Sequence, residues 1–193
     1  NNRISKGKEN MSHLGVICAL GFGSPDMFNY SNVFIKAGFN ICLFCDSDIT
    51  GKNFEYEKEK IKKLGAKVID WQEGECIESI ISEHVPDNIL ADILNLAAMI
   101  KKEETNIDIE IIKKELRDSC KERFYKLFGK EKDYLFYSKD SRKAIGQVLN
   151  DGGWFKRIDK SERLGKLLFD SSDKFKDTIL GQRLDELSKW IDE

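Results

Sequence analysis

The sequence predicts an α/β protein with a parallel, doubly wound sheet followed by a helical C-terminal region. Three strand-like runs, residues 15–20, 41–45 and 66–71, alternate with stretches of helical periodicity. Regular alternation with short connections is typical of right-handed βαβ units. Beyond the third run only helical periodicity continues. We therefore expect an α/β core over residues 1–85 and a helical part over residues 86–193 that packs on it.

Length and composition restrict the class of protein. A chain of 193 residues with 40% hydrophobic content is long enough for a real core. No apolar run approaches the roughly 18 residues of a membrane span, and no charged-then-apolar leader opens the chain. We expect a cytoplasmic protein with no membrane contact. Because the chain opens with Asn1 in a polar stretch, we also expect it to be a piece of a longer polypeptide.

The cysteines point to reduced thiols. The chain has 5 cysteines, an odd number, mostly in apolar surroundings, and this pattern is typical of buried free thiols rather than disulfides. Cys42 and Cys45 form a C-x-x-C motif within a strand-like run. No second pair and no nearby histidine accompany them, so a zinc site is not expected.

The first apolar run continues into a glycine-rich turn. Gly21 and Gly23 allow close backbone approach, and Pro25 suits the first turn of the next helix. Free amides at that helix N-terminus, with Ser24 beside them, form a candidate phosphate-binding site. A plain tight turn is the alternative. The helix that follows should end at Gly38, which suits a C-cap.

Two carboxylates stand where the second run ends. Residues 41–45 are apolar without interruption, as expected of a strand buried on both faces. Asp46 and Asp48 are two residues apart, so in extended geometry they point the same way. Two hard oxygen ligands on one side suit Mg²⁺ or Mn²⁺. The alternative is that one Asp caps the turn and the other is merely solvated.

A third acidic residue is expected at the same edge of the sheet. A charged helix from Phe54 to Leu64, closed by Gly65, leads into the third run, residues 66–71. Glu78 then opens the next helix near the carboxyl end of that strand. It is a candidate metal ligand, and its alternative role is to complement the helix N-terminus.

Amphipathic helices account for the rest of the chain. We expect them at residues 89–97, 108–116, 121–128, 142–149, 160–169 and 174–190. The loop between the fourth and fifth contains two glycines, two aromatic residues and two cations. Trp154 and Phe155 should anchor this loop to the core and hold Lys156 and Arg157 in place.

Charge is unevenly distributed along the chain. Residues 1–112 hold 12 Lys and Arg against 18 Asp and Glu, whereas residues 113–166 hold 16 against 9. An acidic metal centre followed by a basic segment suits a polyanionic substrate, with Arg157 among the cations that would contact phosphate. The alternative is a set of helices with mixed-charge, solvated faces.

The order of motifs resembles a known family. ALGFG, AGFNICLFCDSD, LGAKVIDWQEGECIESII, RKAIG and GGWFKRIDKSERLGKLL together resemble the Toprim nuclease domain of the OLD (overcoming lysogenization defect) endonucleases. The resemblance covers most of residues 15–170. It implies a Toprim-type sheet that works beside an ABC-type ATPase, in a family many of whose members serve in antiviral defence against phage.

The resemblance also assigns roles to single residues. Asp46 and Asp48 match the metal-binding D-x-D, Glu78 matches the acidic residue that opens the next helix, and Lys156 matches a lysine near the end of the domain. The family's first catalytic glutamate lies on an upstream strand, and no E-G motif stands there in this sequence. The ATP-binding pattern G-x-x-x-x-G-K-[ST] does not occur in it either, so the ATPase is expected to be a separate domain or subunit.

The sequence therefore predicts a Mg²⁺- or Mn²⁺-dependent DNA endonuclease module, a hydrolase that forms a homo-oligomer through its ATPase partner. A metal-activated water would attack the phosphodiester, and Lys156 would offset charge on the transition-state phosphate. Two alternatives stay open. One is a D-x-D phosphatase whose first Asp is the nucleophile, and the other is a non-catalytic Toprim domain used for binding or assembly.

Overall fold

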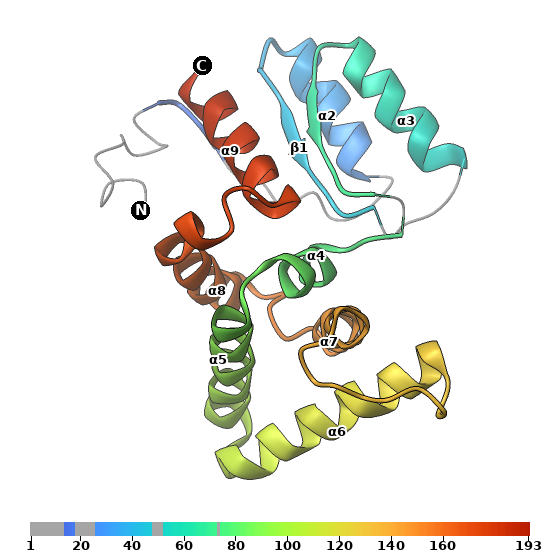
Figure 1. The fold of residues 1–193 in the computed structure, drawn as a ribbon. Helices are drawn as coiled ribbons and strands as arrows, with labels where there is room; N and C mark the ends of the chain where they lie inside the picture. The colour runs from blue at the N-terminus through green and yellow to red at the C-terminus, as the bar shows by residue number, and fades with distance from the viewer. Residues whose placement is uncertain (1–13, 18–25, 48–51, 73) are drawn as a thin grey trace. The chain divides into compact units, whose positions relative to one another are not determined.

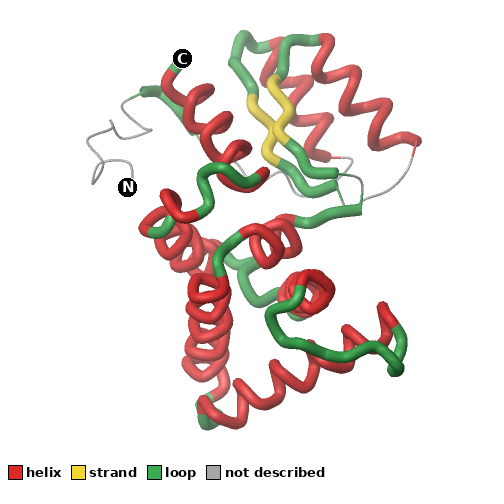
Figure 2. Tube along the Cα trace, in the orientation of Figure 1, coloured by secondary structure: helices red, strands yellow, loops and turns green. Residues whose placement is uncertain are grey.

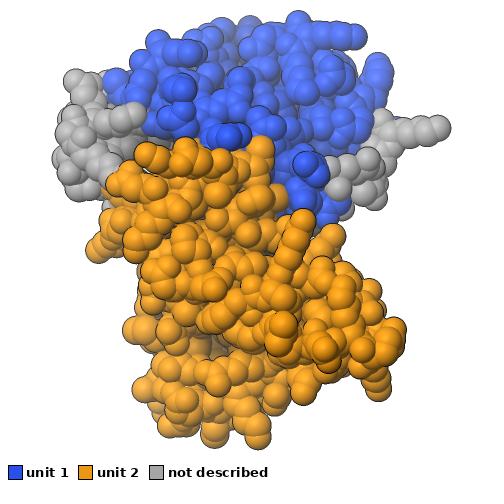
Figure 3. All heavy atoms as spheres, viewed as in Figure 1, with its two compact units in different colours: residues 1–76, 182–193 blue, residues 77–181 orange. Residues whose placement is uncertain are grey.

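The computed structural model describes residues 14–17, 26–47, 52–72 and 74–193. Within these ranges it contains eight α-helices and two β-strands (Figure 1). The chain divides into two compact units, coloured separately in Figure 3: unit 1 comprises residues 1–76 and 182–193, and unit 2 comprises residues 77–181. Among the described residues no helix combines the length and the apolar character needed to cross a membrane.

Unit 1 contains a parallel βαβ arrangement. Its elements are α2 (Asp26–Lys36), β1 (Cys42–Phe44), α3 (Lys52–Lys63), β2 (Lys67–Ile69) and most of α9 (Ile179–Asp192). The two strands pair in parallel, with Leu43 opposite Val68. Gly38 and Gly65 follow α2 and α3 with φ angles of 88° and 99°, a backbone conformation that glycine adopts without steric cost. Both expected helix ends are confirmed.

Side chains of the two strands alternate between two helical layers. Leu43 joins a core cluster with Phe28 of α2 and Phe54 of α3. Lys67 projects from the other face and forms an ion pair with Glu186 of α9. Figure 1 accordingly shows α9 on the opposite side of β1 from α2 and α3. The small sheet of unit 1 is therefore covered on both faces.

The prediction of a parallel, doubly wound Toprim-type sheet is wrong. The described residues contain only a two-stranded sheet, and helices dominate them (Figure 2). Of the first expected strand, residues 15–17 are described, and they form a turn at Gly15 and then irregular backbone. The other two runs pair over only three residues each. An apolar run indicates burial, but a strand also needs a neighbour with matching amides and carbonyls, which only the whole fold supplies.

The regular secondary structure of unit 2 is entirely helical among its described residues. Its elements are α4 (Ile77–His84), α5 (Asp87–Thr105), α6 (Ile109–Phe128), α7 (Lys139–Asp151), α8 (Ile158–Asp170) and a short 3₁₀ turn (Ser172–Lys174). Aliphatic side chains from α4, α5, α6 and α7 are almost fully buried and form its core: Ile80, Ile81, Ile89, Leu90, Ile93, Ile112, Leu116, Ile145 and Leu149.

One helix, α6, replaces the two expected at residues 108–116 and 121–128. Its buried residues follow one another at a spacing of four, Ile112, Leu116, Cys120 and Phe124, so a single apolar stripe runs along the whole helix. The polar residues between the two expected helices lie on its exposed side. Asp108 caps the start, because its side chain accepts a hydrogen bond from the Glu110 amide at 2.8 Å.

Candidate functional site

The segments that leave β1 and β2 are tied to one another by hydrogen bonds. The Ser47 amide donates to the Glu75 carbonyl at 2.9 Å, and the Gly74 amide donates to the Ser47 carbonyl at 2.7 Å. The buried Ser47 hydroxyl also accepts a hydrogen bond from the Trp71 amide at 3.3 Å. These bonds fix the backbone at the carboxyl edge of the strand pair. Asp46, which directly precedes Ser47, is thereby held at this edge.

Asp46 is half-buried, two residues beyond the last residue of β1. It is the described member of the D-x-D motif, since Asp48 lies outside the described residues. The candidate phosphate-binding residues Gly21, Gly23 and Ser24 also lie outside them.

A second acidic residue, Asp70, directly follows β2. Its Oδ2 atom lies 2.7 Å from the Nζ atom of Lys58 on α3, and that ammonium lies 2.6 Å from Glu55 Oε1. Only 9% of the Lys58 side chain is exposed. Burial lowers the pKa of Lys58, but the hydrogen bonds to Asp70 and Glu55 outweigh it and the net shift is upward. The Asp70 carboxylate at this edge is therefore compensated within the fold.

The sequence analysis does not single out Asp70 as a candidate site residue, although Asp70, like Asp46, stands at the end of a strand-like run. Each is an Asp within two residues of the end of a strand, at the same edge of a parallel strand pair. The partner of Asp70 is Lys58, which lies 12 positions away from it in the sequence.

We expect Lys58→Met to lower the free energy of unfolding by about 2 kcal/mol near neutral pH, because it leaves a poorly exposed carboxylate uncompensated. The Lys58 pKa is higher in the folded than in the unfolded chain, so this stabilisation is complete below about pH 10.5 and disappears as pH rises through the folded-state pKa. Urea unfolding at several pH values should show the wild-type advantage shrinking in alkali.

Lys60→Met is the matched control. Lys60 lies on the same helix and pairs with Glu57 at 3.1 Å, but 48% of its side chain is exposed. Its loss should lower the free energy of unfolding by no more than about 0.5 kcal/mol. An equal decrease in the free energy of unfolding for the two variants would contradict a structural role for the Lys58–Asp70 pair.

The thiols of the C-x-x-C motif face different layers. Cys45 packs against the cluster formed with α2 and α3, whereas Cys42 lies on the side of Lys67 and Glu186. Burial raises the pKa of Cys42 to about 11, and burial with the nearby Asp70 and Asp46 carboxylates raises the pKa of Cys45 to about 12. Both thiols are therefore protonated at neutral pH, a state that does not favour metal binding or redox chemistry.

Glu78 lies in the first turn of α4 in unit 2 and is only 6% exposed. Its backbone is held by α7. A Cβ atom added to Gly146 would lie 2.4 Å from the Ser79 Cα atom and 2.9 Å from the Glu78 carbonyl oxygen. The two helices therefore cross backbone to backbone at the turn that carries Glu78, and only glycine permits this approach.

Arg142, also on α7, caps the other end of α4. One guanidinium nitrogen donates to the carbonyls of Ser82 and Val85, each at 2.7 Å, and another pairs with Asp87 at the start of α5. These carbonyls have no partner within α4 itself because they lie at or beyond its last turn. The RKAIG motif thus positions α4 through both Arg142 and Gly146, a role not expected from the sequence.

The loop that links α7 and α8 is anchored by one of its two aromatic residues. Phe155 is only 5% exposed, whereas Trp154 is half-buried. Lys156 follows, and its side chain is exposed. Its amide donates to the Gly153 carbonyl at 3.3 Å. The backbone at Lys156 is therefore constrained while its side chain is exposed.

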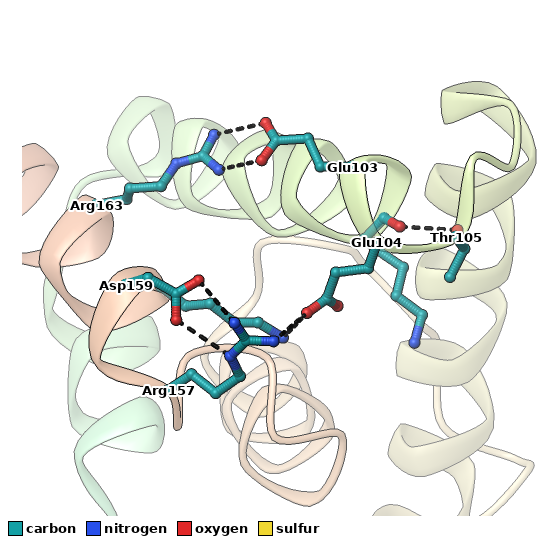
Figure 4. A network of polar contacts seen from close by, with 8 residues as sticks. Glu103, Glu104, Thr105, Arg157, Asp159 and Arg163 are labelled. Atoms are coloured by element: carbon teal, nitrogen blue, oxygen red, sulfur yellow. Dashed lines mark hydrogen bonds and ion pairs between the residues drawn. The ribbon is translucent and has the colours of Figure 1, made fainter.

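Carboxylates hold Arg157, the last candidate phosphate contact (Figure 4). Its Nε atom lies 3.1 Å from Asp159 Oδ1, and a terminal nitrogen lies 3.4 Å from Glu104 Oε1. Lys160 approaches the same Glu104 oxygen at 2.7 Å, and its hydrogen bond is the main reason that the pKa of Glu104 is lowered. A phosphate would have to compete with two carboxylates for Arg157.

The candidate residues are distributed over both units. Asp46 belongs to unit 1, and Glu78, Lys156 and Arg157 belong to unit 2. Within the described ranges no group of three or more His, Cys, Asp or Glu side chains is arranged to hold a metal ion. The described residues therefore do not by themselves form a complete metal site. No protein-family model, curated protein or solved structure matches the chain.

Proposed function

We propose that the chain is a divalent-metal-dependent nuclease module that hydrolyses phosphodiester bonds in DNA and acts beside an ABC-type ATPase in antiviral defence. The observation that carries the proposal is the position of Asp46. This carboxylate lies two residues beyond a parallel strand, and hydrogen bonds through Ser47 fix its backbone. The carboxyl ends of parallel strands are where α/β proteins place their ligands. The resemblance of the motif order to OLD endonucleases suggests the reaction type.

Asp46 and Asp48 are the residues we propose to hold Mg²⁺ or Mn²⁺, and the resemblance to OLD endonucleases also matches Glu78 of unit 2 to an acidic residue of that family. When bound, such an ion acts as a Lewis acid and lowers the pKa of its water. In the hydrolysis, a bond forms between the water oxygen and phosphorus, and one phosphorus–oxygen ester bond breaks. The exposed Lys156 ammonium offsets the negative charge that develops on the phosphate oxygens.

The direct test combines metal binding with cleavage. Calorimetric titration with Mn²⁺ should show binding, and supercoiled plasmid incubated with the chain in Mg²⁺ or Mn²⁺ should be nicked or linearised, with no product in EDTA. A chromogenic phosphate monoester is assayed in parallel. Turnover of the monoester without plasmid cleavage would favour a phosphatase instead. DNA binding with neither activity would favour a binding or assembly module.

Lys156→Ala should lower the single-turnover cleavage rate by roughly 10²-fold or more at saturating DNA, because one preorganised charge at a developing anion is lost. Folding and Mn²⁺ affinity should not change, since the side chain is exposed. Lys156→Arg should rescue only part of the rate, because a planar guanidinium does not replace a compact ammonium at one phosphate oxygen.

Lys166→Ala provides the matched control, since Lys166 is also exposed in unit 2 but lies on α8. It should cleave at the wild-type rate. If Lys156→Ala lowers only DNA affinity, slightly and in a salt-dependent way, then Lys156 is one solvated cation among many.

A further inference from the structure

Unit 2 contains a groove that the proposed active-site residues do not use. Its volume is about 440 Å³, within the range typical of small-molecule pockets. One wall is a single face of α6, with Glu115, Glu122 and Lys126 among its residues. The rest of the lining comes from Lys101 of α5 and from the end of α7 and the loop after it: Val148, Asp151, Gly152 and Trp154.

Trp154 is held in place before any ligand arrives. A Cβ atom added to Gly152 would lie 2.3 Å from the indole Nε1 atom, so the ring lies directly against the Gly152 backbone. The Trp154 amide donates to the Leu149 carbonyl at 3.2 Å. Lys101 Nζ lies 6.0 Å from the ring centroid, close enough for a cation–π contact. A rigid aromatic wall of this kind loses little conformational freedom when it binds a flat ligand.

The charges that line the groove balance one another. Arg123 and Asp151 form an ion pair across it, from α6 to the end of α7. The other charged residues are two cations, Lys101 and Lys126, and two carboxylates on one face of α6, Glu115 and Glu122. A balanced lining does not attract the dense negative charge of a duplex. It suits a ligand with an aromatic ring, hydrogen-bond donors and a single negative charge.

A nucleotide within a single strand has these three features. Its base presents a π-face that can stack on an indole ring, and the exocyclic amino groups of adenine, cytosine and guanine donate to carboxylates. Its one phosphate can pair with a lysine. In a duplex the same base is stacked between its neighbours and paired at its edge, so it cannot enter a groove walled by Trp154.

We propose that this groove binds one nucleotide of single-stranded DNA, with Trp154 stacking on the base and Lys126 contacting the adjoining phosphate. The choice of DNA as the ligand rests on the proposed nuclease function. The groove itself involves neither Asp46 nor Lys156, so substrate binding here is separable from cleavage.

The test measures the fluorescence anisotropy of a dye-labelled single-stranded oligonucleotide of mixed sequence, in EDTA so that no cleavage occurs. Trp154→Ala should weaken binding by roughly tenfold or more, and Trp154→Phe should retain most of the affinity because it keeps a stacking surface. Lys126→Ala should weaken binding and lower the salt dependence of the affinity by about one phosphate contact. Circular dichroism checks that each variant is folded.

Lys114→Ala is the matched control, because Lys114 is exposed on the same helix but does not line the groove. It should bind like wild type.

Three results would each overturn the proposal. They are wild-type affinity in Trp154→Ala, tighter binding of a duplex of the same sequence, and no binding of the single strand. If binding depends on Trp154 but the chain cleaves no DNA, the proposed role of the groove stands and only the nuclease function is refuted. If the wild-type chain cleaves DNA and Trp154→Ala binds the single strand like wild type, only the proposed role of the groove is refuted.

Discussion

Asp46→Asn is expected to abolish metal-dependent cleavage while the chain remains folded. Asparagine has nearly the same shape but carries no charge, so the substitution removes a hard anionic ligand without altering the packing around Ser47. Loss of groups that only support a metal ligand already costs 10- to 100-fold. Removal of the ligand itself should therefore lower the rate by roughly 10²-fold or more.

Two measurements check this result. Calorimetric titration with Mn²⁺ should show weakened binding in the variant, and single-turnover plasmid assays should show little product. Asp185→Asn on α9 serves as the control, because it makes the same chemical change in a carboxylate that is 61% exposed and pairs with Lys189 at 2.7 Å. Unchanged Mn²⁺ affinity in Asp46→Asn would remove Asp46 from the proposed metal site.

Gly146→Ala should have the largest effect on stability and lower the free energy of unfolding by about 2 kcal/mol or more. The added methyl group would lie 2.4 Å from the Ser79 Cα atom, and backbone atoms cannot move aside as the end of a flexible side chain can. Alanine favours a helix by about 1 kcal/mol over glycine, so the cost of separating α7 from α4 must exceed this gain. Because α7 fixes the turn that carries Glu78, the shift should also displace that carboxylate.

Gly165→Ala is the control for this prediction. Gly165 also lies within a helix, α8, but no atom outside its own helix backbone stands within 4 Å of an added Cβ atom. Helix propensity alone should then stabilise the chain by about 0.5–1 kcal/mol. Urea unfolding with unchanged m-values should therefore give changes of opposite sign. Two variants of equal stability would show that α4 and α7 are not in close backbone contact in solution.

Local patterns were enough to predict several parts of this protein. The helix ends at Gly38 and Gly65 follow from the positive φ that glycine tolerates. The position of Asp46 after a strand follows from the apolar run before it, and the start of a helix at Glu78 follows from the periodicity after it. Each of these features depends on residues that are close in the sequence.

The tertiary structure decided what those segments contact. The apolar runs were expected to build a wide sheet, yet the described strands pair only with each other, over three residues each. The partner of Asp70 is Lys58, the carbonyls at the end of α4 are capped by Arg142, and the first turn of α4 rests against Gly146. Periodicity shows which side of a segment is buried, because burial recurs with the geometry of the helix or strand. It does not show which distant residue lies there, because that depends on the path of the whole chain.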